Sequence, residues 1–152
     1  MKPKLTLAVQ FVSTAGTLPT RHQFRKWVLA ALMHDAEVTL RIVDAEEGRH
    51  LNKDYRDKDY ATNVLTFPLN EIPLMGDIIL CAPVISQEAA EQGKALEAHY
   101  AHLTVHGVLH LQGHDHENDV DAEVMEQLET QIVTNLGYPA PYLITENAIA
   151  HG

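Results

Sequence analysis

The sequence has little cysteine, no long apolar run and no obvious targeting segment. Cys81 is the single cysteine among 152 residues, which excludes an internal disulfide framework and fits a reducing compartment. Its apolar surroundings, DIILCAP, favour an inert buried side chain. No stretch approaches the roughly 18 apolar residues of a membrane span. The apolar run at the N-terminus is too short for the hydrophobic region of a signal peptide. We therefore expect a cytoplasmic protein with no membrane partner.

Basic residues are missing from one part of the chain. Residues 95–152 hold nine acidic residues and no lysine or arginine, whereas residues 1–94 hold all 11 basic residues and 12 acidic ones. The net charge of −10 argues against coating nucleic acid by bulk attraction, and we expect no DNA binding. Five basic residues nevertheless gather in residues 41–58, where they form either a local basic face or an ordinary solvated surface: Arg41, Arg49, Lys53, Arg56 and Lys58.

The length predicts one domain spanning residues 1–152, and the periodic segments predict its class. Alternating apolar residues favour strands over 4–12 and 37–44, an extended segment or edge strand over 61–73, and a fourth strand over 77–83. Helical spacing with start and stop signals predicts helices over 21–34, 45–56, 84–93, 96–112 and 118–137. Few strands intermixed with helices predict an α+β fold with one small mixed sheet of about four strands, in an order that the pattern leaves open.

Helix boundaries and apolar faces follow from particular residues. Thr20 and Asp44 are the predicted N-caps of the helices over 21–34 and 45–56. Gly93 and Gly137 are the predicted stops of two later helices, and Pro83 is expected to end the fourth strand. Two helices have a predicted core face, made by Phe24, Trp27, Val28, Ala31 and Leu32 in one and by Val124, Leu128, Ile132, Val133 and Leu136 in the other.

Four histidines lie within the eleven residues HGVLHLQGHDH, and three of them have the spacing of a known class of zinc proteases. His106 and His110 are four residues apart on a predicted helix, so they share a face. Gly113 can end the helix and turn the chain back, which would bring His116 to the same metal. Three imidazoles with a fourth position open make a catalytic zinc site. We expect one zinc ion per chain at His106, His110 and His116, although other borderline divalent metals suit three histidines.

The remaining histidines of this region are weaker candidates for metal ligands. His102 lies about 12 Å along the helix axis from His110, too far to join both ligands. We interpret His99, His102 and His114 as surface residues or as supports for the ligands. Asp115 and the acidic residues of ENDVDAE are candidate hydrogen-bond partners for metal-bound imidazoles. Asp115 could equally be a turn former.

Gly107 stands where the zinc proteases carry a glutamate general base. Without that base, no group beside the metal passes a proton to the leaving amine of a peptide. Cleavage of a phosphodiester depends more on the metal and on a cation that stabilises developing charge. The glycine therefore favours phosphate chemistry if a cation lies near, although a base from elsewhere in the fold stays an alternative.

Three segments in order, YRDKDYATNVLTFP, GDIIL and HGVLHLQGHDH, resemble the signature blocks of the YbeY-type endoribonucleases, small bacterial and organellar proteins of ribosomal RNA maturation. The resemblance spans about residues 38–140. The family usually has proline where Ala61 stands and serine where Thr66 stands, and threonine keeps the hydroxyl. The resemblance implies a small α+β fold, zinc at His106, His110 and His116, and Arg56 in the active-site groove.

The same resemblance implies single-stranded RNA as substrate, in 16S rRNA 3′-end processing and ribosome quality control. It implies contacts with the small ribosomal subunit and with an Era-type GTPase. Our hypothesis assigns catalysis to Arg56 and the three metal ligands, with residues 41–58 guiding the RNA strand. Two alternatives are a metal-dependent hydrolase of another substrate, such as a protease that borrows a base, and a ribosome-assembly factor with little nuclease activity.

Overall fold

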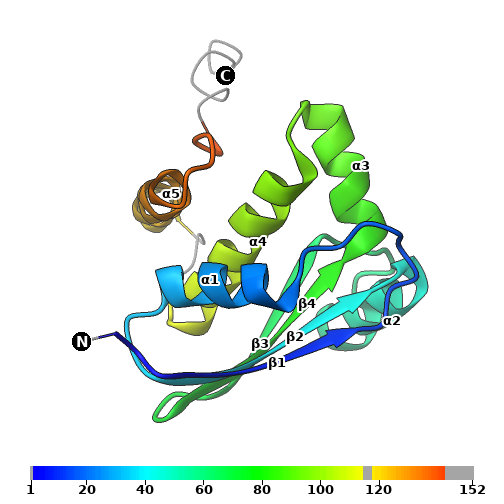
Figure 1. Ribbon diagram of the computed structural model, residues 1–152. Helices are drawn as coiled ribbons and strands as arrows, with labels where there is room; N and C mark the ends of the chain where they lie inside the picture. Colours follow the sequence, from blue (N-terminus) through cyan, green and yellow to red (C-terminus); the bar gives the residue numbers. More distant parts are fainter. Residues whose placement is uncertain (1, 115–117, 143–152) are drawn as a thin grey trace.

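The computed structural model describes residues 2–114 and 118–142, which form a mixed four-stranded sheet and five helices (Figure 1). This confirms the predicted α+β fold. None of the described helices is long and apolar enough to cross a membrane. The elements in chain order are β1 Leu5–Phe11, α1 Arg21–Ala31, β2 Ala36–Val43, α2 Ala45–Arg56, β3 Val64–Asn70, β4 Leu74–Cys81, α3 Ala82–Gln92, α4 Leu96–Leu111 and α5 Asp119–Asn135.

The strands lie in the order β1-β2-β4-β3, so the chain crosses from β2 to the far edge before it returns. β1, β2 and β4 are parallel, whereas β3 pairs antiparallel with β4 and forms an edge. Pro68 lies in β3, where a missing backbone donor is tolerated because the outer side of an edge strand has no partner. The predicted edge strand over 61–73 is therefore confirmed.

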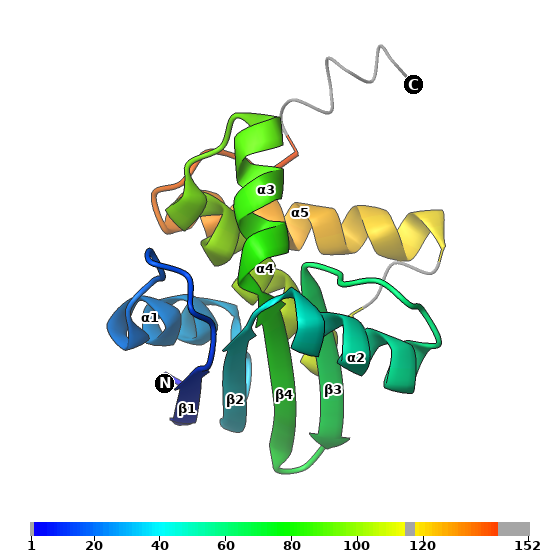
Figure 2. The same cartoon turned by 90° about the vertical axis from the view of Figure 1, so that its right-hand side faces the viewer.

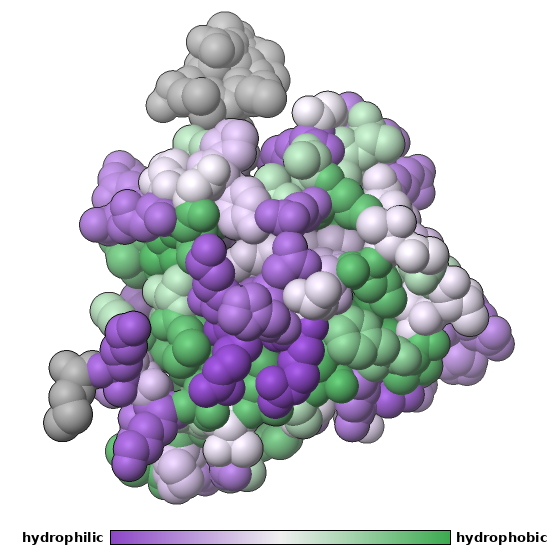
Figure 3. Space-filling view, viewed as in Figure 1, coloured by the Kyte–Doolittle hydropathy of each residue, from purple (hydrophilic) through white to green (hydrophobic). Residues whose placement is uncertain are grey.

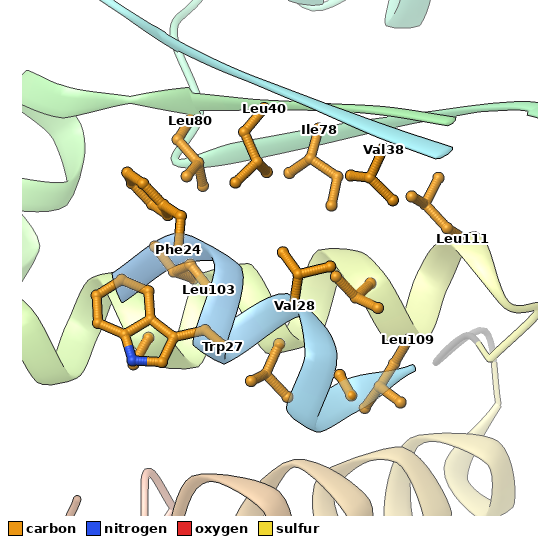
Figure 4. Close-up of a cluster of buried hydrophobic side chains, with 14 of the residues drawn as sticks. Phe24, Trp27, Val28, Val38, Leu40, Ile78, Leu80, Leu103, Leu109 and Leu111 are labelled. Atoms are coloured by element: carbon orange, nitrogen blue, oxygen red, sulfur yellow. The ribbon is translucent and has the colours of Figure 1, made fainter. Parts of the chain in front are cut away.

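The helices cover the two faces of the sheet unequally. α1 and α4 lie against one face, and α5 packs against α4 on the side away from the sheet (Figure 1). α2 lies on the other face, in front of β4 and β3 (Figure 2). Figure 4 shows the larger core, in which Leu40, Ile78 and Leu80 of the sheet point toward Phe24 of α1 and Leu103 of α4. A smaller cluster lies on the α2 side and consists of Val43, Leu65, Ile79 and Cys81.

α1 follows its predicted pattern closely. Thr20 accepts a hydrogen bond from the backbone of Gln23, and the Gln23 side chain accepts one from the backbone of Thr20, which completes a capping box. All the predicted apolar residues of this helix are buried. Its polar side faces outward, and hydrophilic side chains gather in the middle of that face of the molecule (Figure 3). Local amphipathicity is thus sufficient to specify this helix.

α4 is the central helix, packed between the sheet and α5 with α1 and α3 alongside. From His99 to Leu111 every residue is buried except His106 and His110. A helix that is apolar on all sides belongs in a protein interior, and an incompletely buried position on it marks an opening in the packing. The only opening along this stretch of α4 therefore coincides with two of the predicted metal ligands.

Two expectations about helices are wrong in part. Asp44 is the N-cap residue of α2 as predicted, but its side chain makes no capping bond, because its carboxylate accepts hydrogen bonds from Ser13 and Thr14 of the β1–α1 connection instead. Val124 is 47% exposed rather than in the core. The other predicted residues do contact the core: Val133 is buried, and Leu128, Ile132 and Leu136 pack against the core. The most buried positions of α5 are Met125, Glu129 and Val133, a stripe rotated by about one residue from the predicted one. Neither error could be seen from one helix alone, since both depend on neighbouring segments.

Candidate active site

A cavity of about 510 Å³ opens between α4, the C-terminal end of α2 and the edge strand β3. His106 and His110 form one wall, and Arg56 lies on another. The structure therefore brings together the predicted catalytic arginine and two predicted metal ligands from segments fifty residues apart. The cavity is lined by Asn52, Arg56, Lys58, Tyr60, Thr62, Asn63, Val64, Leu65, Thr66, His106 and His110.

The two histidine rings lie next to each other, with centroids 4.6 Å apart and planes at 74°. α4 ends at Leu111, and Gly113 has φ +96°, a left-handed conformation that glycine adopts without strain. The predicted turn after the helix is thus present. His116 lies outside the described residues. Within residues 2–114 and 118–142, no group of three potential ligands surrounds one point.

Glu129 of α5 supports the histidine wall from behind. It is 1% exposed, and one of its oxygens, Oε1, accepts three hydrogen bonds. The donors are His102 Nε2 at 2.6 Å, Tyr142 Oη at 2.9 Å and His106 Nδ1 at 3.1 Å. A buried carboxylate needs such donors to offset its lost hydration. The carboxylate therefore ties α5 to two successive turns of α4.

This carboxylate also favours one tautomer of His106. Burial raises the pKa of Glu129, but hydrogen bonds from His102 and His106 outweigh burial and lower that pKa to about 2. The ionised carboxylate only accepts, so His106 Nδ1 must carry the proton that it donates. A neutral imidazole with its proton on Nδ1 binds a metal ion through Nε2. The arrangement fits a metal-binding imidazole.

Sequence reasoning missed Glu129 and looked for this carboxylate in Asp115 and ENDVDAE. Asp115 lies outside the described residues, while Asp119, Asp121 and Glu123 are exposed on the first turns of α5. A signal was present, because Glu129 lies four residues from both Met125 and Val133 on the buried stripe. A glutamate at a core position of a helix indicates a buried partner.

The other histidines of α4 are interior residues. His99 and His102 are both buried, and His99 Nε2 lies 2.9 Å from the carboxylate of Glu88. Burial is the largest influence on His99 and lowers its pKa. His114 is half-buried just after the turn at Gly113. The interpretation of His102 as a surface residue is wrong, because it is buried and shares Glu129 with His106.

Arg56 is held by main-chain and aromatic contacts rather than by an acid. Its Nη2 donates to the carbonyl oxygen of Thr66 at 2.8 Å, and its guanidinium lies 5.2 Å from the centroid of the Phe67 ring. Within residues 2–114 and 118–142, Arg56 makes no ion pair with Asp54 or Asp59. A guanidinium has five N–H donors, so most of them are still available to an anion in the cavity.

The other basic residues of 41–58 divide into two groups. Arg41 pairs with Glu47 at 2.5 Å, and Arg49 pairs with Asp59 at 2.6 Å. Lys58 lines the cavity beside Arg56, whereas Lys53 is exposed and does not line it. The predicted basic face over 41–58 is therefore narrower than the sequence suggests, with two of its five cations at the cavity.

Gly107 faces the sheet. A Cβ atom built on it would lie 3.0 Å from Ile78 Cγ2 of β4 and 3.4 Å from Thr66 Cγ2 of β3. Such contacts are tighter than ordinary van der Waals packing. The glycine thus lets α4 approach the strands closely, and a longer side chain there would push the histidine wall away from Arg56.

Known proteins match this chain along most of its length. The family model described as Endoribonuclease YbeY matches residues 12–137. The chain belongs to the YbeY family. A relative from Methylobacillus flagellatus named "Endoribonuclease YbeY" is 63% identical over 141 residues, which cover 92% of this chain and 95% of that protein. One from Nitrosomonas europaea with the same name is 61% identical and covers 93% and 87%.

The fold is similar to a solved structure as well. A solution structure of a protein from Thermotoga maritima aligns with a TM-score of 0.59 and 27% identity, covering 82% of this chain and 86% of that one. The YbeY match over residues 12–137 includes every residue that lines the cavity. The family resemblance drawn from the three blocks is therefore confirmed, and the match begins earlier in the chain than residue 38.

Proposed function

We propose that this protein is a metal-dependent endoribonuclease that cleaves single-stranded RNA at the cavity between α4, α2 and β3. One observation carries the proposal: His106, His110 and Arg56 line the same cavity. Imidazoles can hold a borderline divalent metal, and a guanidinium can bind phosphate, so the cavity combines two groups that can promote phosphodiester cleavage. Family membership and the names of the relatives support the same activity.

The metal ligands in this proposal are His106, His110 and His116, with one zinc ion per chain. The fit rests on the contact of His106 Nδ1 with Glu129, since an imidazole that donates through Nδ1 would bind a metal ion through Nε2. When bound, the metal supplies Lewis acidity for attack on the phosphodiester. Three histidines also suit other borderline divalent ions, and metal analysis of the purified protein distinguishes them.

Arg56 acts on the charge that develops during cleavage. The contact with the Thr66 carbonyl orients the guanidinium before substrate arrives, and its remaining N–H groups donate to non-bridging phosphate oxygens. Peptide hydrolysis is a poorer fit, because position 107 is a glycine packed against the sheet and supplies no base. These two features favour RNA over peptide as the substrate.

We further propose, from the family resemblance, that the substrate is ribosomal RNA in the cytoplasm, at the 3′ end of 16S rRNA. Partners would be the small ribosomal subunit and an Era-type GTPase. The net charge of −10 is consistent with a role for partners, since bulk attraction contributes little to RNA affinity. The same charge keeps an assembly factor with weak nuclease activity as the second candidate.

The test compares Arg56→Glu with Lys53→Glu, two charge reversals in the last turn of α2 of which only the first alters the cavity wall. Cleavage of a labelled single-stranded RNA should fall at least about 100-fold in Arg56→Glu, with metal content unchanged. Lys53→Glu should cleave RNA as the wild type does. A chelator should abolish cleavage by the wild type and by Lys53→Glu.

Three results would contradict the proposal. Arg56→Glu could cleave RNA normally, which would remove the arginine from the mechanism. The metal-loaded wild type could cleave casein and leave RNA intact, as a protease would. An inactive His110→Ala variant could still rescue a ribosome-assembly defect in cells, which would favour the assembly factor.

A further inference from the structure

The loop between α2 and β3, residues 57–63, is held tightly although it lies at the surface. Asn52 is a buried polar residue of α2, and its Nδ2 donates to the carbonyl oxygen of Tyr60 at 2.7 Å. The Asn52 carbonyl oxygen accepts from the backbone N–H of Lys58 at 3.2 Å. Arg49 pairs with Asp59 at 2.6 Å between these two anchors. The loop thus keeps a fixed position relative to α2.

This fixed loop presents an aromatic side chain at the cavity. Tyr60 lines the cavity and is 54% exposed. Tyr55 is also exposed, but it does not line the cavity and packs edge-on against Phe67 with centroids 5.2 Å apart. Tyr60 therefore combines a solvent-exposed aromatic ring with a place at the cavity, whereas Tyr55 has only the first of these properties.

The neighbours of Tyr60 suit a nucleic acid strand. Lys58 and Arg56 line the same cavity, and neither makes an ion pair in the part of the chain that the structure describes. Proteins that bind single strands combine cations on the phosphates with aromatic rings on which bases stack. Every base has a π-face, so such a ring accepts many sequences but needs the base to be unpaired.

We propose that Tyr60 is a stacking platform for an unpaired nucleobase beside the cleaved phosphodiester, with Lys58 on an adjacent phosphate. The inference rests on the proposed function and adds a reason for single-strand specificity. In a duplex the bases stack on each other and are not free to stack on Tyr60. Asn52 is then a positioning residue, because it holds the loop that carries the platform.

The experiment uses metal-loaded protein and a fluorescein-labelled 2′-O-methyl oligouridylate of about eight nucleotides, within the usual single-strand site size. A series of otherwise identical oligomers lacks one base at a time. For the wild type, removal of one particular base should weaken binding about 5- to 100-fold by fluorescence anisotropy. Tyr60→Ala should lose this discrimination, and Tyr60→Trp should keep it.

Phe11→Ala is the matched control, since Phe11 is 47% exposed but lies on β1, at the opposite edge of the sheet from β3. It should discriminate as the wild type does. The inference is wrong if the wild type binds all abasic oligomers equally, or if Tyr60→Ala still discriminates. Failure of the proposed function has a different signature, namely that the wild type cleaves no single-stranded RNA, whatever its discrimination between base and abasic sites.

Discussion

The two walls of the cavity are built in opposite ways. The histidine wall belongs to α4, whose other residues from His99 to Leu111 are all buried, and the buried carboxylate of Glu129 holds His106 from the opposite side. The facing wall consists of exposed side chains, Arg56, Lys58 and Tyr60, held through backbone carbonyl oxygens. One wall depends on core packing, and the other depends on a few hydrogen bonds at the surface.

This difference matches what each wall has to do in the proposed mechanism. A metal site requires ligands fixed to within a fraction of an ångström, which packing on rigid elements provides. A strand of RNA arrives in many conformations, and side chains on a surface loop can adjust to it. We therefore expect substitutions behind the histidine wall to alter metal affinity and stability together. Substitutions on the facing wall should alter substrate binding or cleavage and leave metal affinity unchanged.

Glu129→Gln should give the largest effect on the histidine wall. The amide is a neutral acceptor of the same shape, so it holds His106 Nδ1–H less strongly. We expect metal affinity to fall about 10- to 100-fold, as when other hydrogen-bond partners of metal-bound histidines are replaced. Competition titration with a chromophoric chelator measures this affinity directly, without reference to catalysis.

Glu123→Gln is the control, because Glu123 is exposed on the same helix and undergoes the same change in charge. It should bind metal as the wild type does. Equal metal affinity in Glu129→Gln and the wild type would mean that packing alone fixes His106, and the contrast between the two walls would then rest on burial rather than on the carboxylate.

Gly107→Ala should give an intermediate effect on the same wall. Alanine favours a helix over glycine by about 1 kcal/mol, but the new methyl group meets Ile78 at 3.0 Å, and overpacking typically costs about 1–3 kcal/mol. We expect a net loss of about 1 kcal/mol in the free energy of unfolding, measured by urea denaturation. Gly16→Ala is the control, since no atom lies within 4 Å of a Cβ placed there. A more stable Gly107→Ala variant would show that α4 can shift away from the sheet.

The features that the sequence predicts correctly are those set by local interactions, and the features that it misses depend on segments far apart in the chain. His106 and His110 follow from helical spacing, and α1 follows from its capping box and apolar face, because both are local. The role of Glu129 and the side-chain bonds of Asp44 do not follow from the local sequence, because His106 lies 23 residues from Glu129 and Ser13 lies 31 residues from Asp44. The meeting of Arg56 with the histidines depends on the strand order β1-β2-β4-β3, which brings the edge strand beneath α4 and which no local pattern encodes.

Asp44→Asn should give the smallest effect. Asp44 is a carboxylate at the surface, in contrast to the buried carboxylate of Glu129. Hydrogen bonds from Ser13 and Thr14 lower the pKa of Asp44 below its usual value of 3.8. Because the pKa is lower in the folded protein, the carboxylate stabilises the fold fully above that usual value and progressively less as pH falls through the folded pKa. The difference in unfolding midpoint between wild type and Asp44→Asn should therefore be constant near neutral pH and shrink below about pH 4. Ser13→Ala removes the strongest of these bonds and should reduce the same difference. A difference that does not change with pH would mean that the shape of the side chain, and not its charge, holds the β1–α1 connection to α2.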